Sequence, residues 1–194
     1  MTKQMKTNLL LFAGLVALGC LGRILPHPPN FTPLAAIGLF AGYLLGSNRY
    51  SLLVIPCAML LSDAFVGFYD PQLMIVIYGT LLCAVVIGAV LLRGNLSVVR
   101  LGICSLAIST IFCVTTNLAW WAMSGMYESS LNGLMTCFAN AVPFFRYTLM
   151  GDAFWTAALF GSYALVMRSA FQPVADSTGT ATGVGPRQNV LPVS

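Results

Sequence analysis

Long apolar stretches separated by short polar breaks account for most of the sequence. A membrane-spanning helix needs roughly 20 mostly apolar residues. Six stretches approach that length, at about residues 8–25, 32–48, 50–67, 71–92, 98–122 and 147–167. The pattern therefore predicts an all-α polytopic integral membrane bundle with six transmembrane helices.

Two further segments do not fit the spanning pattern. Residues 131–145 are apolar but short and end near Pro143, so we expect an outer loop helix or a re-entrant piece. Residues 169–194 are rich in Gly, Ser, Thr and Pro, which is typical of disorder. We therefore divide the chain into a transmembrane domain, residues 1–168, and a disordered cytoplasmic tail, residues 169–194.

The composition favours lipid over water as the main solvent of the chain. Of its 194 residues, 58% are hydrophobic and only 7% are charged, against roughly 25% charged residues in soluble domains. The net charge of +4 is dispersed, and no Lys/Arg run predicts contact with nucleic acid. The first apolar stretch reaches Cys20 in a pattern that also resembles a lipoprotein signal, but the apolar stretches that follow favour a first span.

The basic residues predict how the chain lies in a bacterial inner (plasma) membrane. With the N-terminus inside, most of the nine Lys and Arg residues obey the positive-inside rule. Those on the cytoplasmic side are then Lys3, Lys6, Arg49, Arg93, Arg100, Arg168 and Arg187. Only Arg23 and Arg146 fall outside. An even number of spans returns the C-terminus to the cytoplasm, so we expect both termini there.

Five polar groups from four predicted spans are expected at one depth, in the outer third of the bilayer. They are Arg23, Asp63, Asn117, Arg146 and Asp152. An ionisable group in a span costs several kcal/mol unless it is paired or faces water. The five groups therefore predict structural ion pairs, Arg23 with Asp63 and Arg146 with Asp152, or a ligand pocket, and the two are compatible.

The loop between the first two predicted spans is unusually rigid. Residues 26–33 contain four prolines, which exclude a helix and fix the backbone. Such a loop either covers a pocket or only connects two helices, and His27 within it is either a solvated histidine or a ligand-binding one. Nearby aromatic residues form either an interfacial belt or stacking walls; they are Phe68, Tyr69, Trp120, Trp121, Tyr127, Phe144, Phe145, Tyr147 and Trp155.

Small residues recur on one face of the second predicted span. Gly38, Gly42 and Gly46 are spaced by four residues, which lets helices approach closely. This face serves either packing within the bundle or docking onto another membrane protein.

Several kinds of chemistry lack their sequence motifs. The chain has no GxxxxGK[ST], HExxH or GxSxG motif, and its six cysteines include no CxxC pair. With one histidine and no metal-ligand spacing, we expect no metal, no cofactor and no enzymatic activity. Paired aspartates, Asp63 and Asp152, leave an acid/base enzyme as the weakest alternative.

Four motifs carry a family resemblance over about residues 21–167. They are RILPHPPNFTP at 23–33, TNLAW at 116–120, GMY at 125–127 and PFFRYTLMGD at 143–152. Together they resemble a bacterial family of domains of unknown function described as candidate membrane transport proteins. The architecture also resembles the S components of energy-coupling-factor transporters, which are six-span proteins that capture vitamins or metal ions from outside.

The resemblance implies both termini in the cytoplasm, an outward-facing pocket and energy supplied by a separate transporter ATPase module. It also implies that the glycine face docks onto that module, although this chain has Gly where the first span of S components usually has an Ala pair.

These observations together predict a membrane binding subunit for a small organic nutrient or vitamin. The alternative is a membrane scaffold or assembly protein that transports nothing. The predicted substrate-binding residues are Arg23, His27, Asn30, Asp63, Asn117, Trp120, Arg146 and Asp152.

Overall fold

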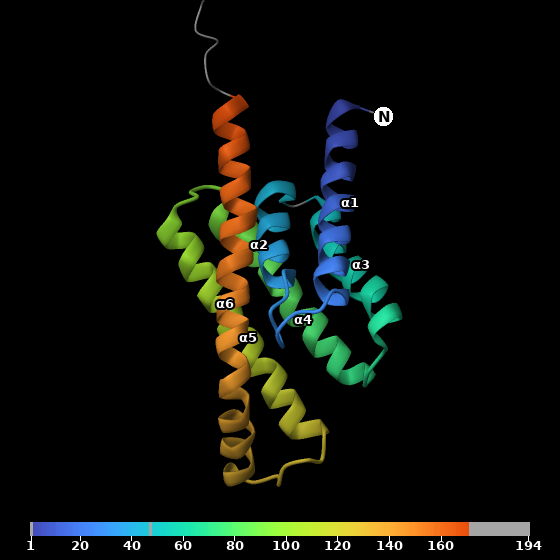
Figure 1. The fold of residues 1–194 in the computed structure, drawn as a ribbon, viewed down its shortest axis with the longest axis vertical. Helices are drawn as coiled ribbons and strands as arrows, with labels where there is room; N and C mark the ends of the chain where they lie inside the picture. Colours follow the sequence, from blue (N-terminus) through green and yellow to red (C-terminus); the bar gives the residue numbers. More distant parts are fainter. Residues whose placement is uncertain (1, 47, 171–194) are drawn as a thin grey trace, which may run out of the picture.

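A computed structural model describes residues 2–46 and 48–170, and every regular element in this range is helical. Figure 1 shows the arrangement of the helices. They are α1 (Lys3–Ile24), α2 (Leu34–Leu45), α3 (Arg49–Val66), α4 (Pro71–Ile87), the π-helical η1 (Gly88–Leu92), α5 (Val98–Met123) and α6 (Leu131–Ala170). The predicted tail lies outside the described residues beyond position 170.

Short polar side chains begin four of the helices. Thr2, Asn48, Asp70 and Ser97 each accept a hydrogen bond from a backbone N–H in the first turn that follows. Such caps satisfy donors that have no partner inside the helix. The polar breaks in the sequence therefore become helix starts, and the chain runs up and down the bundle. The start of α1 and the end of α6 lie at the same end (Figure 1).

Five helical segments are long and apolar enough to cross a membrane. The exception is α2, which has 12 residues and measures about 18 Å, well short of a hydrocarbon core roughly 30 Å thick. It lies in the centre of the bundle, and almost all of its residues are buried. The second predicted span is thus a short, enclosed helix, and a count of six spans stays a prediction.

The prediction for residues 131–145 is wrong, because this segment is the first part of α6 and not a separate piece. The helix is 40 residues long in all and runs through Pro143 without ending there. A proline in an apolar helix removes one backbone hydrogen bond, and neighbouring helices can hold the turns on either side. Here Cys137 and Ala141 are buried just before the proline, and the Cys137 thiol lies 3.6 Å from the Asn117 carbonyl oxygen of α5.

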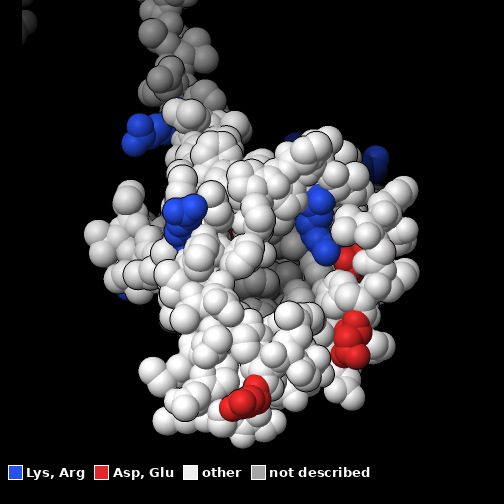
Figure 2. Space-filling model, turned by 60° about the horizontal axis from the view of Figure 1, so that its bottom comes forward, with Lys and Arg blue, Asp and Glu red and all other residues white. Residues whose placement is uncertain are grey.

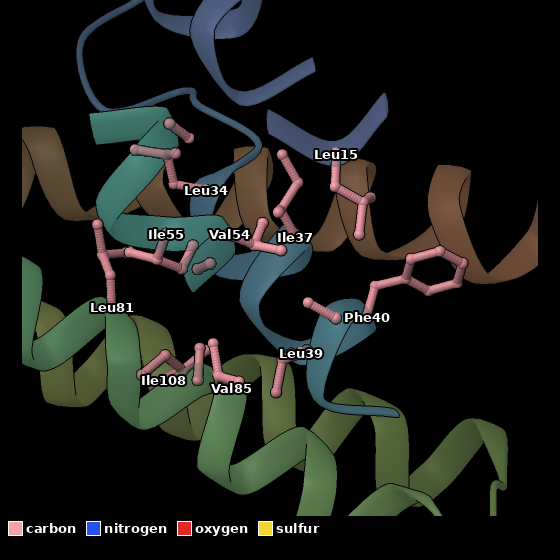
Figure 3. Packing of buried hydrophobic residues seen from close by; sticks show 14 of the residues in the cluster. Leu15, Leu34, Ile37, Leu39, Phe40, Val54, Ile55, Leu81, Val85 and Ile108 are labelled. Atoms are coloured by element: carbon pink, nitrogen blue, oxygen red, sulfur yellow. The ribbon is translucent and has the colours of Figure 1, made fainter. Parts of the chain in front are cut away.

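The apolar core surrounds α2 on several sides. Figure 3 shows the side chains of α2 meeting those of α1, α3, α4 and α5. Ile37 and Leu39 are fully buried, and Phe40 packs edge-on against Phe160 of α6 with ring centroids 5.0 Å apart. The shortest of the six α-helices is therefore the one on which the others pack.

The glycine face of α2 is covered by the same chain. A Cβ on Gly38 would lie 2.7 Å from that of Ala84, and a Cβ on Gly42 would collide with the Val85 carbonyl oxygen of α4. The π-helical η1 continues this contact, because Gly88 lies against the backbone of Leu39. The glycines serve packing inside the bundle, so Gly38 and Gly42 are not open to a docking partner. Gly46, the third residue of the predicted docking face, lies against the Arg93 guanidinium.

Gly42→Ala should destabilise the protein by about 1–3 kcal/mol, because the new methyl group must push α2 away from α4. Gly102→Ala is the matched control, because a Cβ there meets no atom within 4 Å and an alanine in the interior of α5 is favoured by up to about 1 kcal/mol. Thermal melting of the two purified variants checks this. Equal melting temperatures would show that the α2–α4 contact is looser than described.

Candidate functional site

Three adjoining cavities form one hollow at the end of the bundle opposite the start of α1. Cavities of about 260 Å³ and 290 Å³ are joined through a smaller one of about 40 Å³, and Asn30 and Phe112 line all three. Figure 2 shows the surface hollowed at this end, with basic and acidic side chains around it. We call this space the Asn30 hollow; its walls come from the loop at residues 25–33 and from all six α-helices.

The proline-rich loop places Asn30 by its backbone conformation. Asn30 has φ 61°, a left-handed conformation that asparagine tolerates better than most residues. The Phe31 N–H closes the turn by donating to the Pro28 carbonyl oxygen at 3.0 Å. Asn30 is exposed and lines all three cavities, and in the part of the chain that the structure describes its carboxamide has no hydrogen-bond partner.

Two glycines hold this loop against the helices. A Cβ on Gly22 of α1 would collide with the Pro33 ring, and a Cβ on Gly151 of α6 would lie 3.0 Å from the Phe31 Cα. Phe31 also stacks on Phe154, with ring centroids 5.7 Å apart. The loop is thus held against α1 at Pro33 and against α6 at Phe31, and it acts as a wall of the hollow.

Arg23 and Asp63 form the buried ion pair that the sequence predicts. Arg23 Nη1 lies 2.5 Å from Asp63 Oδ1 and donates to Ser62 Oγ at 2.7 Å. The second carboxylate oxygen of Asp63 accepts from the Tyr78 hydroxyl at 2.6 Å. Asp63 is fully buried behind Arg23, and it is Arg23 that borders the hollow. The pair joins α1 to α3, and Tyr78 adds α4.

Tyr69 stands beside this pair, in the loop between α3 and α4. It lines the same cavity as Arg23. Burial, together with the negative charge of Asp63, raises the pKa of the Tyr69 phenol to about 12. Tyr69 therefore presents a neutral hydroxyl to the hollow at any physiological pH.

The second predicted ion pair, Arg146 with Asp152, does not form. Asp152 is 4% exposed, and its Oδ2 lies 2.5 Å from Ser109 Oγ of α5. Arg146 is exposed, donates to the Tyr147 hydroxyl at 3.0 Å and covers that ring. Six residues of a helix rotate the chain by about 600°, so these two side chains leave α6 in different directions. Only Asp152 borders the hollow.

The cavity of about 260 Å³ is lined by aromatic and polar groups, most of them from α5 and α6. Asn117 and Trp120 both line it, as predicted. Asn117 Nδ2 donates to the Cys113 backbone carbonyl oxygen at 2.7 Å. The side-chain Oδ1 of Asn117 is left to accept a hydrogen bond from a ligand. The other aromatic and hydroxyl groups in this wall are Phe112, Thr116, Phe144, Phe145 and Thr148.

His27 is the predicted residue that the structure places farthest from this role. It is exposed, and its Nδ1 lies 2.8 Å from the Pro28 carbonyl oxygen. It is not among the residues that line the hollow. Among residues 2–46 and 48–170 there is also no group of three His, Cys, Asp or Glu side chains that could hold a metal ion.

Sequence reasoning missed the hydroxyl groups beside the predicted residues. Ser109, Thr116 and Thr148 were not singled out, although each stands on the side of its helix that faces Asp152 or the hollow. The spacing carried a usable signal, because Ser109, Thr116 and Trp120 recur at intervals of seven and four residues, which places them on one helical face.

Comparison with known proteins identifies a family but no function. Residues 3–175 match the model of a family described as a family of unknown function (DUF6580). No curated protein and no solved structure matches the chain.

Arg23→Ala should lower the free energy of unfolding by about 3–5 kcal/mol, because it leaves Asp63 charged, buried and unpaired. Arg146→Ala is the control and should change stability by no more than about 0.5 kcal/mol, because Arg146 is exposed. Replacing both partners, Arg23→Met with Asp63→Leu, should recover most of the loss. Thermal melting in detergent measures all three, and wild-type melting of Arg23→Ala would contradict the described network.

Proposed function

Since the chain belongs to the DUF6580 family, whose function is not established, we propose from its own geometry that it is a membrane-embedded binding protein. Its ligand is a small organic molecule that enters the Asn30 hollow from the outer side of a bacterial inner membrane. Uptake of a nutrient or vitamin is the transport role that this binding serves.

The observation that carries the proposal is the mixture of groups around the hollow. Small-molecule sites are concave and mostly apolar, with a few polar groups that fix orientation. Here aromatic walls surround the unpartnered carboxamide of Asn30 and the free acceptor of Asn117, and a rigid loop holds Asn30 in place. A role as a scaffold alone gives no reason for a free carboxamide to line all three cavities.

The orientation follows from the charges at the two ends of the bundle. Within the described residues, Lys3, Lys6, Arg93, Arg100 and Arg168 lie at or near helix ends on the side away from the hollow. The positive-inside rule places that side in the cytoplasm. The hollow then opens outward, both ends of the described chain face inward, and α2 counts as a sixth, short span enclosed by the other five.

Transport requires a source of energy, and this chain has no P-loop that would bind ATP. The sequence holds no GxxxxGK[ST] motif, so a separate ATPase module or a rocking motion of the bundle would move the ligand. The scaffold alternative has less support, because the face it relies on at Gly38 and Gly42 is filled by α4 of the same chain.

The wild-type protein should co-purify with a small organic molecule. The amount of this molecule bound to the protein should be at least fivefold lower in Asn30→Gly. Glycine removes the carboxamide and tolerates the left-handed backbone, so a loss of ligand reports recognition and not strain. Asn132→Ala, at an exposed position on α6, is the matched control and should retain the ligand. Extraction and mass spectrometry of the three purified proteins measures this.

Two results would count against the binding role. The first is the absence of any stoichiometric small molecule from the wild-type protein purified under native conditions. The second is an equal amount of ligand in Asn30→Gly and in the wild type.

A further inference from the structure

The charges around the Asn30 hollow do not cancel. The positive charge of Arg23 is matched by Asp63 at 2.5 Å, and Arg146 is exposed and points to Tyr147. Asp152 remains, lining the small cavity that joins the two larger ones. In the described part of the chain, Arg23–Asp63 is the single ion pair, so Asp152 has no cation. The formal charge left for a ligand to neutralise is therefore negative.

The surroundings of Asp152 suit both the hollow without a ligand and the hollow with a bound cation. Its single hydrogen-bond partner in the described residues is Ser109, whose hydroxyl also lies 2.9 Å from the Ser105 carbonyl oxygen. A hydroxyl has one proton to donate. Ser109 can donate it to Ser105 while a protonated Asp152 donates to Ser109, or turn it toward an ionised Asp152. An ionised carboxylate without a cation is costly here, so either a proton or a cation must accompany it.

The dimensions of the hollow match a cation that has an apolar body. The cavity at Asp152 measures about 40 Å³, which is room for one group the size of a water or an ammonium. It shares Asn30, Phe112 and Thr148 with the cavity of about 260 Å³ whose walls include Trp120 and Phe144. Aromatic faces attract cations and also bury apolar rings.

We propose that the ligand of the Asn30 hollow is an organic monocation whose ammonium group binds Asp152 and whose aromatic or apolar body lies against Phe112, Phe144 and Trp120. This inference rests on the proposed binding function and names its ligand class. Asp152 provides the charge, Asn30 and Thr148 provide hydrogen bonds, and the Arg23–Asp63 pair remains structural.

Three probes that share a phenyl ring and a two-carbon arm test the sign of the charge. They are 2-phenylethylammonium, the neutral 2-phenylethanol and the anion 3-phenylpropionate, titrated calorimetrically into the full chain in detergent. The cation should bind at least tenfold more tightly than the neutral probe, and the anion should bind most weakly. In Asp152→Asn the preference of cation over neutral should fall below threefold.

Two further variants separate recognition from folding. Glu128→Gln makes the same carboxylate-to-amide change at an exposed position and should keep the preference for the cation. Ser109→Ala keeps the carboxylate and removes its hydroxyl partner, so it should keep the preference as well. The melting temperature of each variant shows whether it is folded. If Asp152→Asn is not folded, the pH dependence of cation binding to the wild-type protein supplies the test.

The pH dependence provides a second reading of the same site, because a proton and the cation compete for Asp152. The Kd of 2-phenylethylammonium should rise as pH falls from about 8 to about 5, and should stay constant in Asp152→Asn. The groups that face Asp152 from the loop, α2, α4, α5 and α6 are Asn30, Thr32, Ala35, Leu81, Ser109, Phe112 and Thr148, and none of them titrates.

Farther from Asp152 lie the charged Arg23–Asp63 pair, the neutral phenol of Tyr69, and His27 on the outside of the loop. His27→Gln removes the one histidine of the sequence; it is the control and should leave the pH dependence unchanged.

Several results would overturn the inference. Equal affinity for the cation and the neutral probe, or no binding of the cation, would remove the role of Asp152 as a counter-charge. Tightest binding of the anion would make Arg23 the recognition group; the proposed binding function would then stand while the cationic class would fall. A co-purified neutral or anionic ligand would have the same meaning.

Discussion

A fully buried carboxylate, Asp63, is the constraint on which the end of the bundle that holds the Asn30 hollow depends. Its ionised form is tolerable only because Arg23 and Tyr78 bring hydrogen-bond donors from two other helices. These contacts fix α1, α3 and α4 relative to one another at the level of the hollow. They also use the charge of Arg23 inside the protein, which decides what the hollow can recognise.

The short central helix explains why there is a hollow at all. Close contact at Gly42 and Gly88 holds α2 against α4 and η1, but α2 begins only at Leu34 and does not fill the end of the bundle where the hollow lies. The chain before it is the proline-rich loop, which Gly22 and Gly151 hold against the walls. The space that a full span would occupy is thereby left to a rigid loop, a free carboxamide and a cavity.

The sequence predicts most of the helices and part of the site. Apolar length alone placed the helices at residues 50–67, 71–92 and 98–122 close to their observed bounds, because each is flanked by a capping residue or a loop. Pro143 was misread as a helix end, since local rules do not show that α5 supports the turn before it. Position along a span predicted one depth for Arg23, Asp63, Asn117 and Asp152. In the structure Arg23, Asn117 and Asp152 line adjoining cavities, and Asp63 is buried behind Arg23. The direction in which each side chain leaves the helix axis could not be estimated from position along a span, and for this reason Arg146 was wrongly paired with Asp152.

Access of water to the Asn30 hollow from the outer side is the central claim, and the native Cys113 reports on it directly. Cys113 lines the cavity of about 260 Å³ in this hollow, so a variant that keeps it and replaces the other cysteines with alanine can be treated in intact cells with a membrane-impermeant, positively charged thiol reagent. We predict modification from the outer side, at a rate that falls when Asn30 is replaced by tryptophan to block the hollow. Modification only after the cells are opened, or no modification while the unfolded chain reacts fully, would contradict an outward-opening binding site.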